Sequence, residues 1–471
     1  MPNWALGGDG ILAGLAVAMR ATSVELLLFA AVFILLFGLG DMLIDALWLG
    51  NRTMRAPARK VVRGRPLAHR MAILIPTWRE AEVIGGTLAH ASAAWRGEPY
   101  RIYVGVYAND GATLLRVAAQ AALDANIRIV IHARHGPTTK ADCLNAIWRA
   151  LRADETIEGD RYDAIILHDA EDFVDPAELA AFDRALYDHA FVQLPVIPLI
   201  PGRGAWIAGH YCDEFAEAHQ KDIIVRHRIG APIPAAGVGC AFRRDAIAMM
   251  AGGGDPFCAD SLVEDYEMGL AIGQAGLPST FFRARGPDGA LIAVRSHFPA
   301  DLESSVRQKA RWIAGIALSG WDRIGWAGGW NRRHIASNWM LWRDRRTVLS
   351  AIVTIAAYLG AVLLVSSQAT TAFLGIEQAP VPALMGPLLA ASSVVLVWRL
   401  AMRFVCTARL YGRAEGLRAV PRAFVSNVVS VVAVHRALVL YIKALCGAQL
   451  RWDKTPHVTS AVPLRIERIR S

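Results

Sequence analysis

The chain has 471 residues, with 50 lysines and arginines against 41 aspartates and glutamates and a formal net charge of +9. Hydrophobic residues make up 54% of it and charged residues 19%, whereas an average soluble protein has about 25% charged residues. This composition excludes a disordered chain, a collagen-like repeat and a small disulfide scaffold. The six cysteines form no CxxC pair, so they fit neither a zinc ribbon nor a disulfide framework.

The first apolar block lies in the N-terminal segment, residues 1–50. The stretch 26–40 carries no charge and the apolar character continues to residue 49, which is long enough for the roughly 20 residues of a membrane-spanning helix. A cleaved signal peptide is excluded because the run is too long and has no basic front. The linker that follows, residues 51–70, carries seven positive charges and no acid, which places the downstream side in the cytoplasm.

Short apolar runs alternate with helical stretches in the segment 71–300, which predicts an α/β fold with a parallel sheet. The four runs are residues 72–75, 102–107, 127–131 and 164–167. Ligands of such sheets bind outside the carboxyl ends of the strands, and acidic residues follow three of these ends: Glu80, Asp110 and the cluster 169–172. We therefore expect three acidic groups to converge on one crevice, although a single loop carboxylate is usually only a cap or a turn residue.

The cluster after the fourth run is a candidate metal site. Carboxylates in a pocket need a counter-charge, and a divalent cation bound to a diphosphate supplies one. Asp169 and Glu171 are the candidate ligands, with Asp172 beside them, and an exposed acidic turn is the alternative. Upstream, a turn leads Lys140 and Asn145 into a helix, whose start attracts anions and is a candidate site for donor phosphate and nucleobase.

Two helices are predicted after the sheet. The first opens at residue 264 and ends before Gly276, so Asp265 lies near its N-terminus, where a helix cap is the alternative role. The second begins at residue 301, in the segment 301–346, and its apolar residues form one stripe at about 100° per residue. The opposite side of this amphipathic helix carries an amide, a guanidinium and an aromatic ring that can face a ligand, namely Gln308, Arg311 and Trp312.

The remaining apolar blocks lie near the C-terminus. Residues 347–402 contain two predicted membrane-spanning helices, at 347–376 and 378–398, whose connection has no lysine or arginine and is expected to be periplasmic. The basic tail, residues 403–471, then returns to the cytoplasm. Its apolar stretch 423–446 is interrupted by charged residues, so we interpret it as an amphipathic or re-entrant helix on the inner face, with a fourth span as the alternative. The basic stretches fit anionic lipid, and no motif indicates nucleic acid.

In the order and type of these motifs, residues 71–326 resemble a membrane-integrated family-2 glycosyltransferase with the GT-A fold, the class of the cellulose, chitin and hyaluronan synthases. The resemblance places the DxD metal motif at 169–171, the TED base motif at 263–265 and an intact QxxRW motif at 308–312. One residue in DxD and one in TED depart from the family pattern, Glu171 and Val263 respectively.

The resemblance implies a role for each candidate residue. The uracil and ribose of a nucleotide sugar would be held by Thr77, Glu80 and Asp110. Mg²⁺ or Mn²⁺ would be held by Asp169 and Glu171, and the donor diphosphate would be contacted by Lys140 and Arg311. The general base would be Asp265, and the acceptor would be contacted by Gln308, Trp312 and Glu264.

More narrowly, the stretches 168–172, 263–267, 315–322 and 452–457 resemble bacterial inner-membrane glycosyltransferases known as phage-adsorption proteins. This implies an inverting hexosyl or N-acetylhexosaminyl transferase that is multi-pass in the inner membrane, with a cytoplasmic catalytic domain. The expected donor is a UDP-linked sugar, and the expected acceptor is a growing surface glycan or a lipid-linked molecule in the bilayer. Three spans are few for a channel, so we expect a partner subunit or an oligomer to complete any export path.

Other interpretations stay open. The main alternative is a non-catalytic scaffold or receptor subunit with a degenerate transferase domain, which the departures in DxD and TED favour and the intact QxxRW disfavours. A polyprenyl-phosphate sugar transferase is disfavoured because that group lacks QxxRW. The His, Cys and acidic residues between 210 and 219 match no zinc motif, so we interpret them as a polar helix face. On the resemblance, the glycine turn at 237–241 would line the acceptor side.

Overall fold

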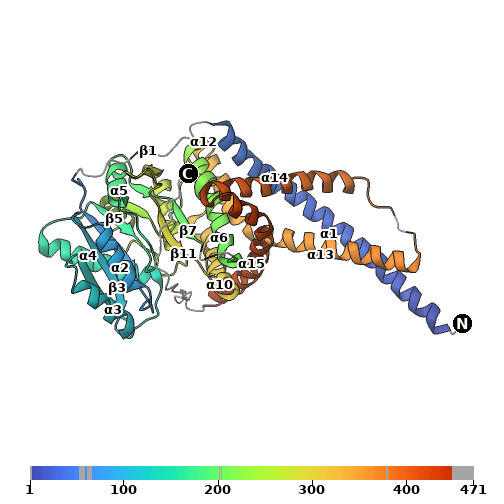
Figure 1. Ribbon diagram of the computed structural model, residues 1–471, viewed down its shortest axis with the longest axis horizontal. Helices are drawn as coiled ribbons and strands as arrows, with labels where there is room; N and C mark the ends of the chain where they lie inside the picture. The colour runs from blue at the N-terminus through green and yellow to red at the C-terminus, as the bar shows by residue number, and fades with distance from the viewer. Residues whose placement is uncertain are drawn as a thin grey trace.

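The computed structural model describes residues 3–51, 59–60, 66–200, 202, 204–377 and 380–447. Most of the basic linker, and the 452–457 motif of the tail, lie outside these described residues. Within them, an α/β domain forms one end of the molecule, and long helices project from it (Figure 1).

A seven-stranded mixed sheet forms the centre of the α/β domain. Its strands, in spatial order, are β4 (Ile127–His132), β3 (Tyr100–Tyr107), β2 (Met71–Pro76), β5 (Ala164–Leu167), β8 (Cys240–Arg243), β6 (Phe191–Gln193) and β9 (Ser279–Phe281). The four strands expected from the apolar runs, β2 to β5, are parallel neighbours, which confirms that prediction. We expected a parallel sheet, but β8 is antiparallel to both β5 and β6, so the sheet is mixed.

Two hydrophobic layers cover the sheet, because successive side chains of a strand point to opposite faces. Even-numbered residues of β2 pack on the face that α4 (Lys140–Glu158) covers, and odd-numbered residues pack on the other face. The helices of that other face are α2 (Ile84–Ala94), α3 (Gly111–Ala121) and α5 (Glu178–Leu186). All residues of β2 are buried, and each fully buried Leu or Ile side chain contributes about 1.5–3 kcal/mol. Burial on both faces therefore explains the unbroken apolar runs.

Shorter elements complete the domain. β7 (Val196–Leu199) and β11 (Val294–His297) form a separate parallel pair, and β10 (Ala284–Arg285) pairs with β1 (Arg59–Lys60). The other helices of the domain are α6 (Trp206–Glu217), the π-helical turn η1 (Ala218–Asp222), α7 (Ile223–Arg228), α8 (Arg244–Ala251) and α9 (Glu264–Gln274). The domain is linked to the projecting helices through α10 (Leu302–Ile313), the π-helical turn η2 (Ala314–Ser319), α11 (Gly320–Ile324) and α12 (Arg332–Arg345).

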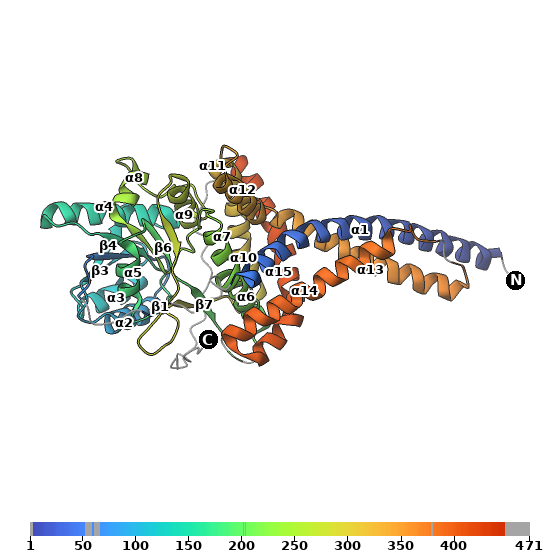
Figure 2. The same cartoon turned by 90° about the horizontal axis from the view of Figure 1, so that it is seen from above.

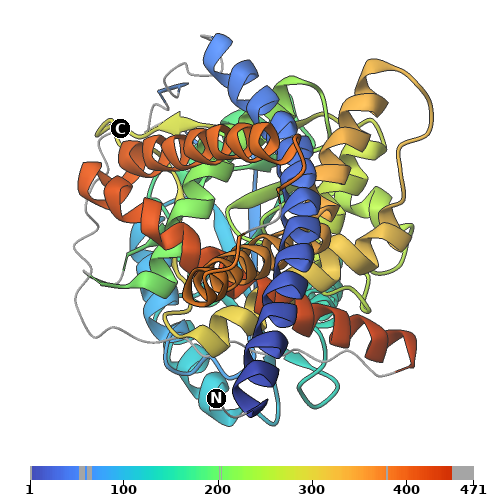
Figure 3. The same cartoon turned by 90° about the vertical axis from the view of Figure 1, so that its right-hand side faces the viewer.

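Four helices of the described chain are long and apolar enough to cross a membrane: α1 (Asn3–Gly50), α13 (Thr347–Leu374), α14 (Met385–Tyr411) and α15 (Arg413–Leu445). Three of them, α1, α13 and α14, project from the domain, whereas α15 lies beside α6 and α10 (Figures 1 and 2). Figure 3 looks onto the projecting helices from their free end, with α1 in front. Since length and composition also allow α15 to cross, its place on the inner face stays a prediction.

α1 is longer than the sequence pattern indicated. Its 48 residues form one helix, which is about 72 Å long at 1.5 Å per residue and exceeds a hydrocarbon core of about 30 Å. The sequence indicated the last turns of α1 only as the end of a membrane span. In the structure these turns pack on the α/β domain. Ile44 and Trp48 belong to the same hydrophobic layer as α4, so α1 is part of the domain core as well as a candidate span.

Buried charges fix α1 where it meets the domain. Asp41 accepts hydrogen bonds from Arg343 at 2.5 Å and from Arg399 at 2.6 Å, and Arg346 also donates to it. We call these four residues the Asp41 junction. One turn further along α1, Asp45 is bound at 2.6 and 2.8 Å by Lys221 and Trp398.

Asp213 of α6 joins the domain to α14 and α15. Its side chain is completely buried and accepts two hydrogen bonds from Arg422, at 2.8 and 2.9 Å, and one from Thr407 at 3.2 Å. The adjacent Glu214 accepts from Lys309 Nζ at 2.6 Å. In the described ranges no three His, Cys, Asp or Glu side chains are grouped to bind a metal. The polar cluster between 210 and 219 therefore serves helix packing.

Replacing Asp213 by alanine is expected to lower the free energy of unfolding by about 3–5 kcal/mol, because the Arg422 guanidinium stays buried without its main partner. The measurement is denaturant unfolding of the detergent-purified protein. Asp245→Ala is the matched control, since its pair with Arg243 is exposed and such pairs contribute about 0–1 kcal/mol. Equal losses in the two variants would contradict the assigned role of Asp213.

Candidate active site

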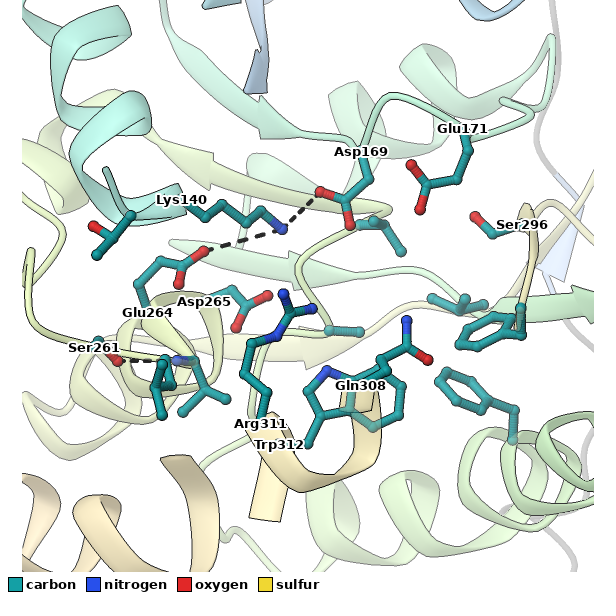
Figure 4. A pocket seen from close by; sticks show the side chains of 18 of the residues that line it. Lys140, Asp169, Glu171, Ser261, Glu264, Asp265, Ser296, Gln308, Arg311 and Trp312 are labelled. Carbon is teal, nitrogen blue, oxygen red and sulfur yellow. Dashed lines mark hydrogen bonds and ion pairs between the residues drawn. The ribbon is translucent and has the colours of Figure 1, made fainter. Parts of the chain in front are cut away.

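One cavity lies where the carboxyl end of β5 meets the N-termini of α4 and α9 and one side of α10 (Figure 4). The space that it encloses is about 890 Å³ when the open mouth is included. Eight of the eleven candidate residues line it: Lys140, Asp169, Glu171, Glu264, Asp265, Gln308, Arg311 and Trp312. The fold therefore brings together residues from four separate parts of the chain.

Lys140 stands at the start of α4 and points its ammonium at the carboxylates. Thr139 caps the helix by accepting from the Asp142 backbone N–H at 3.1 Å, which fixes where α4 begins. Lys140 Nζ lies 2.6 Å from Asp169 Oδ1 and 4.0 Å from Glu264 Oε1. Burial disfavours the charged ammonium, but the facing carboxylates, Asp169 above all, outweigh it and raise the pKa of Lys140 above its ordinary value. The ammonium therefore stays charged.

The carboxylates that follow β5 fit a divalent cation. Burial, and then the charges of Asp169 and Glu80, raise the pKa of Glu171 well above its usual value. A cation bound there would relieve this repulsion. Carboxylate oxygens are the hard ligands that Mg²⁺ and Mn²⁺ take, and two carboxylates leave coordination positions for diphosphate oxygens. Asp169 and Glu171 therefore suit the metal role expected of them.

Asp265 lies in the first turn of α9 with its carboxylate in the cavity (Figure 4). The N-cap of α9 is Val263, so Asp265 does not occupy the capping position. Asp265 Oδ1 accepts from the Tyr266 backbone N–H at 2.6 Å. Burial raises the pKa of Asp265, and the charge of Lys140 acts in the opposite sense. A carboxylate with a raised pKa accepts a proton more readily than an exposed one, as a general base must.

The neighbouring carboxyl group is perturbed as well. Burial, and then the charge of Asp265, raise the pKa of Glu264 to about 7. Both adjacent carboxyl groups therefore hold a proton more readily than an exposed carboxylate does.

The backbone of Gly237 closes one side of the Asp265 carboxylate. Its φ is +78°, a conformation that glycine adopts without steric cost. A Cβ at this position would lie 2.0 Å from Asp265 Oδ2. The flanking residues Ala236 and Val238 line the cavity, so the glycine turn forms a wall of the same site.

α10 presents its polar side to the cavity. Asp301 caps it by accepting from the Ser304 backbone N–H at 2.8 Å, and its apolar stripe packs in a cluster with α15. Gln308, Arg311 and Trp312 all line the cavity, which confirms that they lie opposite the stripe. After Ile313 the helix passes into η2.

Aromatic rings fix the position of Trp312. Its ring centroid lies 6.0 Å from that of Tyr211 and 6.4 Å from that of Phe298, both edge-on. Phe215 of α6 is also 6.4 Å away. Phe215, Phe298 and Trp312 line the end of the cavity nearest α6, so the site has a charged end at β5 and an aromatic end at α6.

Three candidate residues lie outside the cavity. Thr77 is fully buried, and its hydroxyl donates to the Gly105 carbonyl at 2.7 Å. Asp110 caps α3 and accepts from the Arg79 backbone N–H at 2.5 Å. Glu80 is buried as well. In this structure Thr77 and Asp110 hold the backbone after β2, and their contact with uracil or ribose stays a prediction.

Two residues considered as ligand contacts bind the protein instead. The Asn145 amide donates to the Phe257 carbonyl at 2.7 Å and accepts from the Phe257 N–H at 3.1 Å, so it ties α4 to the loop before α9. Asp172 accepts from Ser296 and His168. The sequence does not show which way a side chain of a turn or a first helical turn points, and a ligand contact of Asn145 stays a prediction.

The sequence pattern missed the aromatic end of the site. Phe215 lies on α6, Phe298 follows β11, and Ser296 and His297 are on β11 itself. No motif joins these positions, and they meet only because β11 pairs with β7.

A mixed α/β sheet covered on both faces, with acidic residues and a lysine at the carboxyl ends of its strands, defines an α/β GT-A-type glycosyltransferase domain. Residues 69–315 match the family model described as "Glycosyltransferase like family 2". Since this match covers more than half of the chain, the chain belongs to that family.

Curated relatives match over most of the chain. Bacteriophage adsorption protein B of Escherichia coli (strain K12) is 32% identical over 460 residues, which cover 91% of this chain and 61% of the relative. Bacteriophage N4 adsorption protein B of Escherichia coli O157:H7 matches to the same extent. The chain thus spans about three fifths of the length of these relatives.

Solved structures are also similar. A mannosyltransferase from Pyrobaculum calidifontis, in complex with GDP-Man and Mn²⁺, is 15% identical with a TM-score of 0.47, over 88% of this chain and 99% of that protein. Glucosyl-3-phosphoglycerate synthase from Mycobacterium tuberculosis, in complex with Mn²⁺, UDP and phosphoglyceric acid, is 15% identical with a TM-score of 0.35. The match covers 57% of this chain and 86% of that protein.

Gly237→Ala is expected to lower turnover about 100-fold, because the added Cβ displaces the Asp265 carboxylate and a misplacement of about 1 Å has this effect. Nucleoside diphosphate release measures it. Gly289→Ala is the matched control, since Gly289 has a φ of +79° but no atom within 4 Å of an added Cβ. If both variants lose activity equally, backbone strain and not the contact with Asp265 is responsible.

Proposed function

We propose that the protein is an inverting glycosyltransferase of the bacterial inner membrane, which moves a sugar from a UDP-linked donor to a growing surface glycan or a lipid-linked acceptor. The observation that carries this proposal is the shared cavity of Lys140, Asp169, Asp265, Arg311 and Trp312. These residues supply a phosphate contact, a metal ligand, a base and an acceptor platform in one space, in a chain that belongs to a glycosyltransferase family.

The donor diphosphate occupies the charged end of the cavity. Lys140 supplies an ammonium there, and Arg311 places a guanidinium near Glu264 and Asp265. Asp169 and Glu171 would hold a divalent cation, which neutralises diphosphate charge when it is bound. Both cationic side chains stabilise the negative charge that develops on the leaving nucleoside diphosphate.

The acceptor approaches from the aromatic end. Its sugar ring stacks on Trp312, whose orientation Tyr211 and Phe298 fix. Asp265 takes the proton of the acceptor hydroxyl, and the hydroxyl oxygen attacks the anomeric carbon in line with the leaving group. A new C–O bond forms, the bond from the anomeric carbon to the diphosphate breaks, and the proton ends on the Asp265 carboxylate. Attack from the opposite side inverts the anomeric configuration.

The arrangement of basic residues supports a cytoplasmic site. Arg343, Arg346 and Arg399 gather around Asp41 at the domain end of the projecting helices. Lysine and arginine mark the cytoplasmic side of membrane helices. If α1, α13 and α14 are the spans among the described helices, three helices are too few to enclose a path for a polymer, so we expect a partner subunit or an oligomer to complete any export route.

The two departures from the family motifs are compatible with an enzyme. Val263 is buried and packs in one cluster with Ile316 and Trp312, and a Cβ on Gly315 of η2 would come within 2.6 Å of it. Its role is therefore packing, which valine performs without a hydroxyl. Glu171 still presents a carboxylate to the cavity (Figure 4).

Asp265→Asn is expected to reduce turnover about 10²- to 10⁴-fold while donor binding persists, because one positioned base contributes that factor. Release of nucleoside diphosphate is measured with detergent-purified protein on a panel of UDP- and GDP-linked sugars. Asp260→Asn, an exposed carboxylate in the preceding loop, is the matched control. If the folded wild type releases no nucleoside diphosphate from any donor of the panel, with candidate acceptors and partners added, the scaffold interpretation would be favoured.

Removal of divalent metal is expected to abolish release, and Mg²⁺ or Mn²⁺ to restore it. Glu171→Gln keeps the shape of the side chain but loses one ligand charge. The metal concentration that gives half-maximal activity should therefore rise at least about tenfold. A metal titration of activity in wild type and variant measures this. Full activity in the presence of a strong chelator would contradict the metal role of Asp169 and Glu171.

A further inference from the structure

The residue that follows the proposed base is anchored outside the cavity. The Tyr266 backbone N–H donates to Asp265 Oδ1 at 2.6 Å, while the Tyr266 hydroxyl donates to Asp344 Oδ2 at 2.7 Å. Tyr266 is only 7% exposed. A single residue therefore connects the carboxylate of the base to Asp344, which lies near the end of α12.

A second connection runs from Asp344 to the other side of Asp265. Asp344 Oδ2 also accepts from Arg226 Nη1 at 2.8 Å, and Arg226 Nε donates to the Pro232 carbonyl at 2.6 Å. Pro232 begins the stretch that leads to Gly237, whose backbone closes on Asp265 Oδ2. Asp344 thus holds both walls around the base, α9 through Tyr266 and the 232–237 loop through Arg226.

The 232–237 loop and α9 are packed without free space. A Cβ on Gly269 of α9 would lie 2.3 Å from the Ala235 backbone nitrogen, and one on Gly273 would lie 2.7 Å from Pro232 Cβ. A shift of either element therefore moves the other. The two connections from Asp344 act on one rigid unit that contains the base.

The neighbours of Asp344 in sequence bind the membrane helix α1. Arg343 donates to Asp41 at 2.5 Å, and Arg346 donates to Asp41 and to the Phe37 carbonyl, the latter at 3.1 Å. α13 begins at residue 347, directly after this group. Residues 343–346 therefore face α1 on one side and the base on the other.

We propose that Asp344 is a positioning residue for Asp265, and that through it the Asp41 junction sets the geometry of the base. The inference rests on the proposed function, because it assigns Asp265 the role of general base. Asp344 touches neither donor nor acceptor, since it is not among the cavity residues. Its effect on transfer is exerted through Tyr266 and Arg226, and the assembled membrane helices are part of the catalytic geometry.

Tyr266→Phe tests the first connection with the smallest change, because it removes one hydroxyl and keeps the ring. We expect kcat to fall about 10- to 100-fold, as for a slightly misplaced catalytic group, while KM for the donor stays within about twofold. Tyr103→Phe is the matched control, since its buried hydroxyl bonds to Tyr162 at 3.2 Å within the same domain. An unchanged kcat in Tyr266→Phe would overturn the proposal.

Asp344→Asn tests the shared anchor, because it removes the charge that both Tyr266 and Arg226 contact and keeps the shape. We expect a similar fall in kcat at unchanged donor KM. In the double variant with Tyr266→Phe, the fall should be close to that of Asp344→Asn alone, since the Tyr266 hydroxyl acts only through Asp344. If the fall in kcat of the double variant equals the product of the two single falls, the two residues act independently, which would contradict the proposal.

Hydrogen exchange separates this inference from the proposed function. Backbone amides of residues 264–268 should exchange about tenfold faster in Asp344→Asn than in wild type, and at the wild-type rate in Tyr103→Phe. This readout needs no turnover. If wild type transfers no sugar, the proposed function fails, and the exchange rates still decide whether Asp344 holds α9. Equal exchange in all three proteins would overturn the positioning role.

Discussion

The structure of the site depends on one ionic contact, between the Lys140 ammonium and carboxylates that come from β5 and α9. Asp169 and Glu264 belong to elements almost a hundred residues apart, and both lie within 4.0 Å of Lys140 Nζ. Unit charges at such distances interact by about 4 kcal/mol at an effective dielectric constant of 20. Without the ammonium, the acidic ends of the two elements would repel each other. With it, they line one cavity.

The sequence predicted the parts of the fold that rest on local pattern. The runs of β2, β3 and β5 are apolar because both of their faces are covered, and that signal is visible without neighbours. The polar side of α10 was visible from helical periodicity in the same way. β7 and β11 were not predicted, because two four-residue strands that pair across about a hundred residues leave no local signal. The contacts of Asn145 and Asp172 within the protein were not predicted for a related reason, since the residue type shows the chemistry but not the direction of the side chain.

The candidate site could be predicted only as far as its motifs reach. Lys140, Asp169 and Trp312 were found by residue type and position, the role of Asp265 came from the resemblance, and the fold brings the four residues together. Phe215 and Phe298 were not found, because an aromatic residue in a helix or after a strand is usually core. The contact between Tyr266 and Asp344 could not be predicted from the sequence either. Their contact joins positions 78 residues apart and exists only because α12 packs beside α9.

The Asp41 junction also has a consequence for the order in which the protein is made. Asp41 emerges from the ribosome 302 residues before Arg343 and 305 before Arg346. At about 5–20 residues per second, the carboxylate waits roughly 15–60 s for these partners. During this time the sheet, α4 and α9 are completed while Asp41 lacks its arginine partners. The junction can close only after the whole α/β domain has been synthesised, so the closing of this junction is a late step of biogenesis.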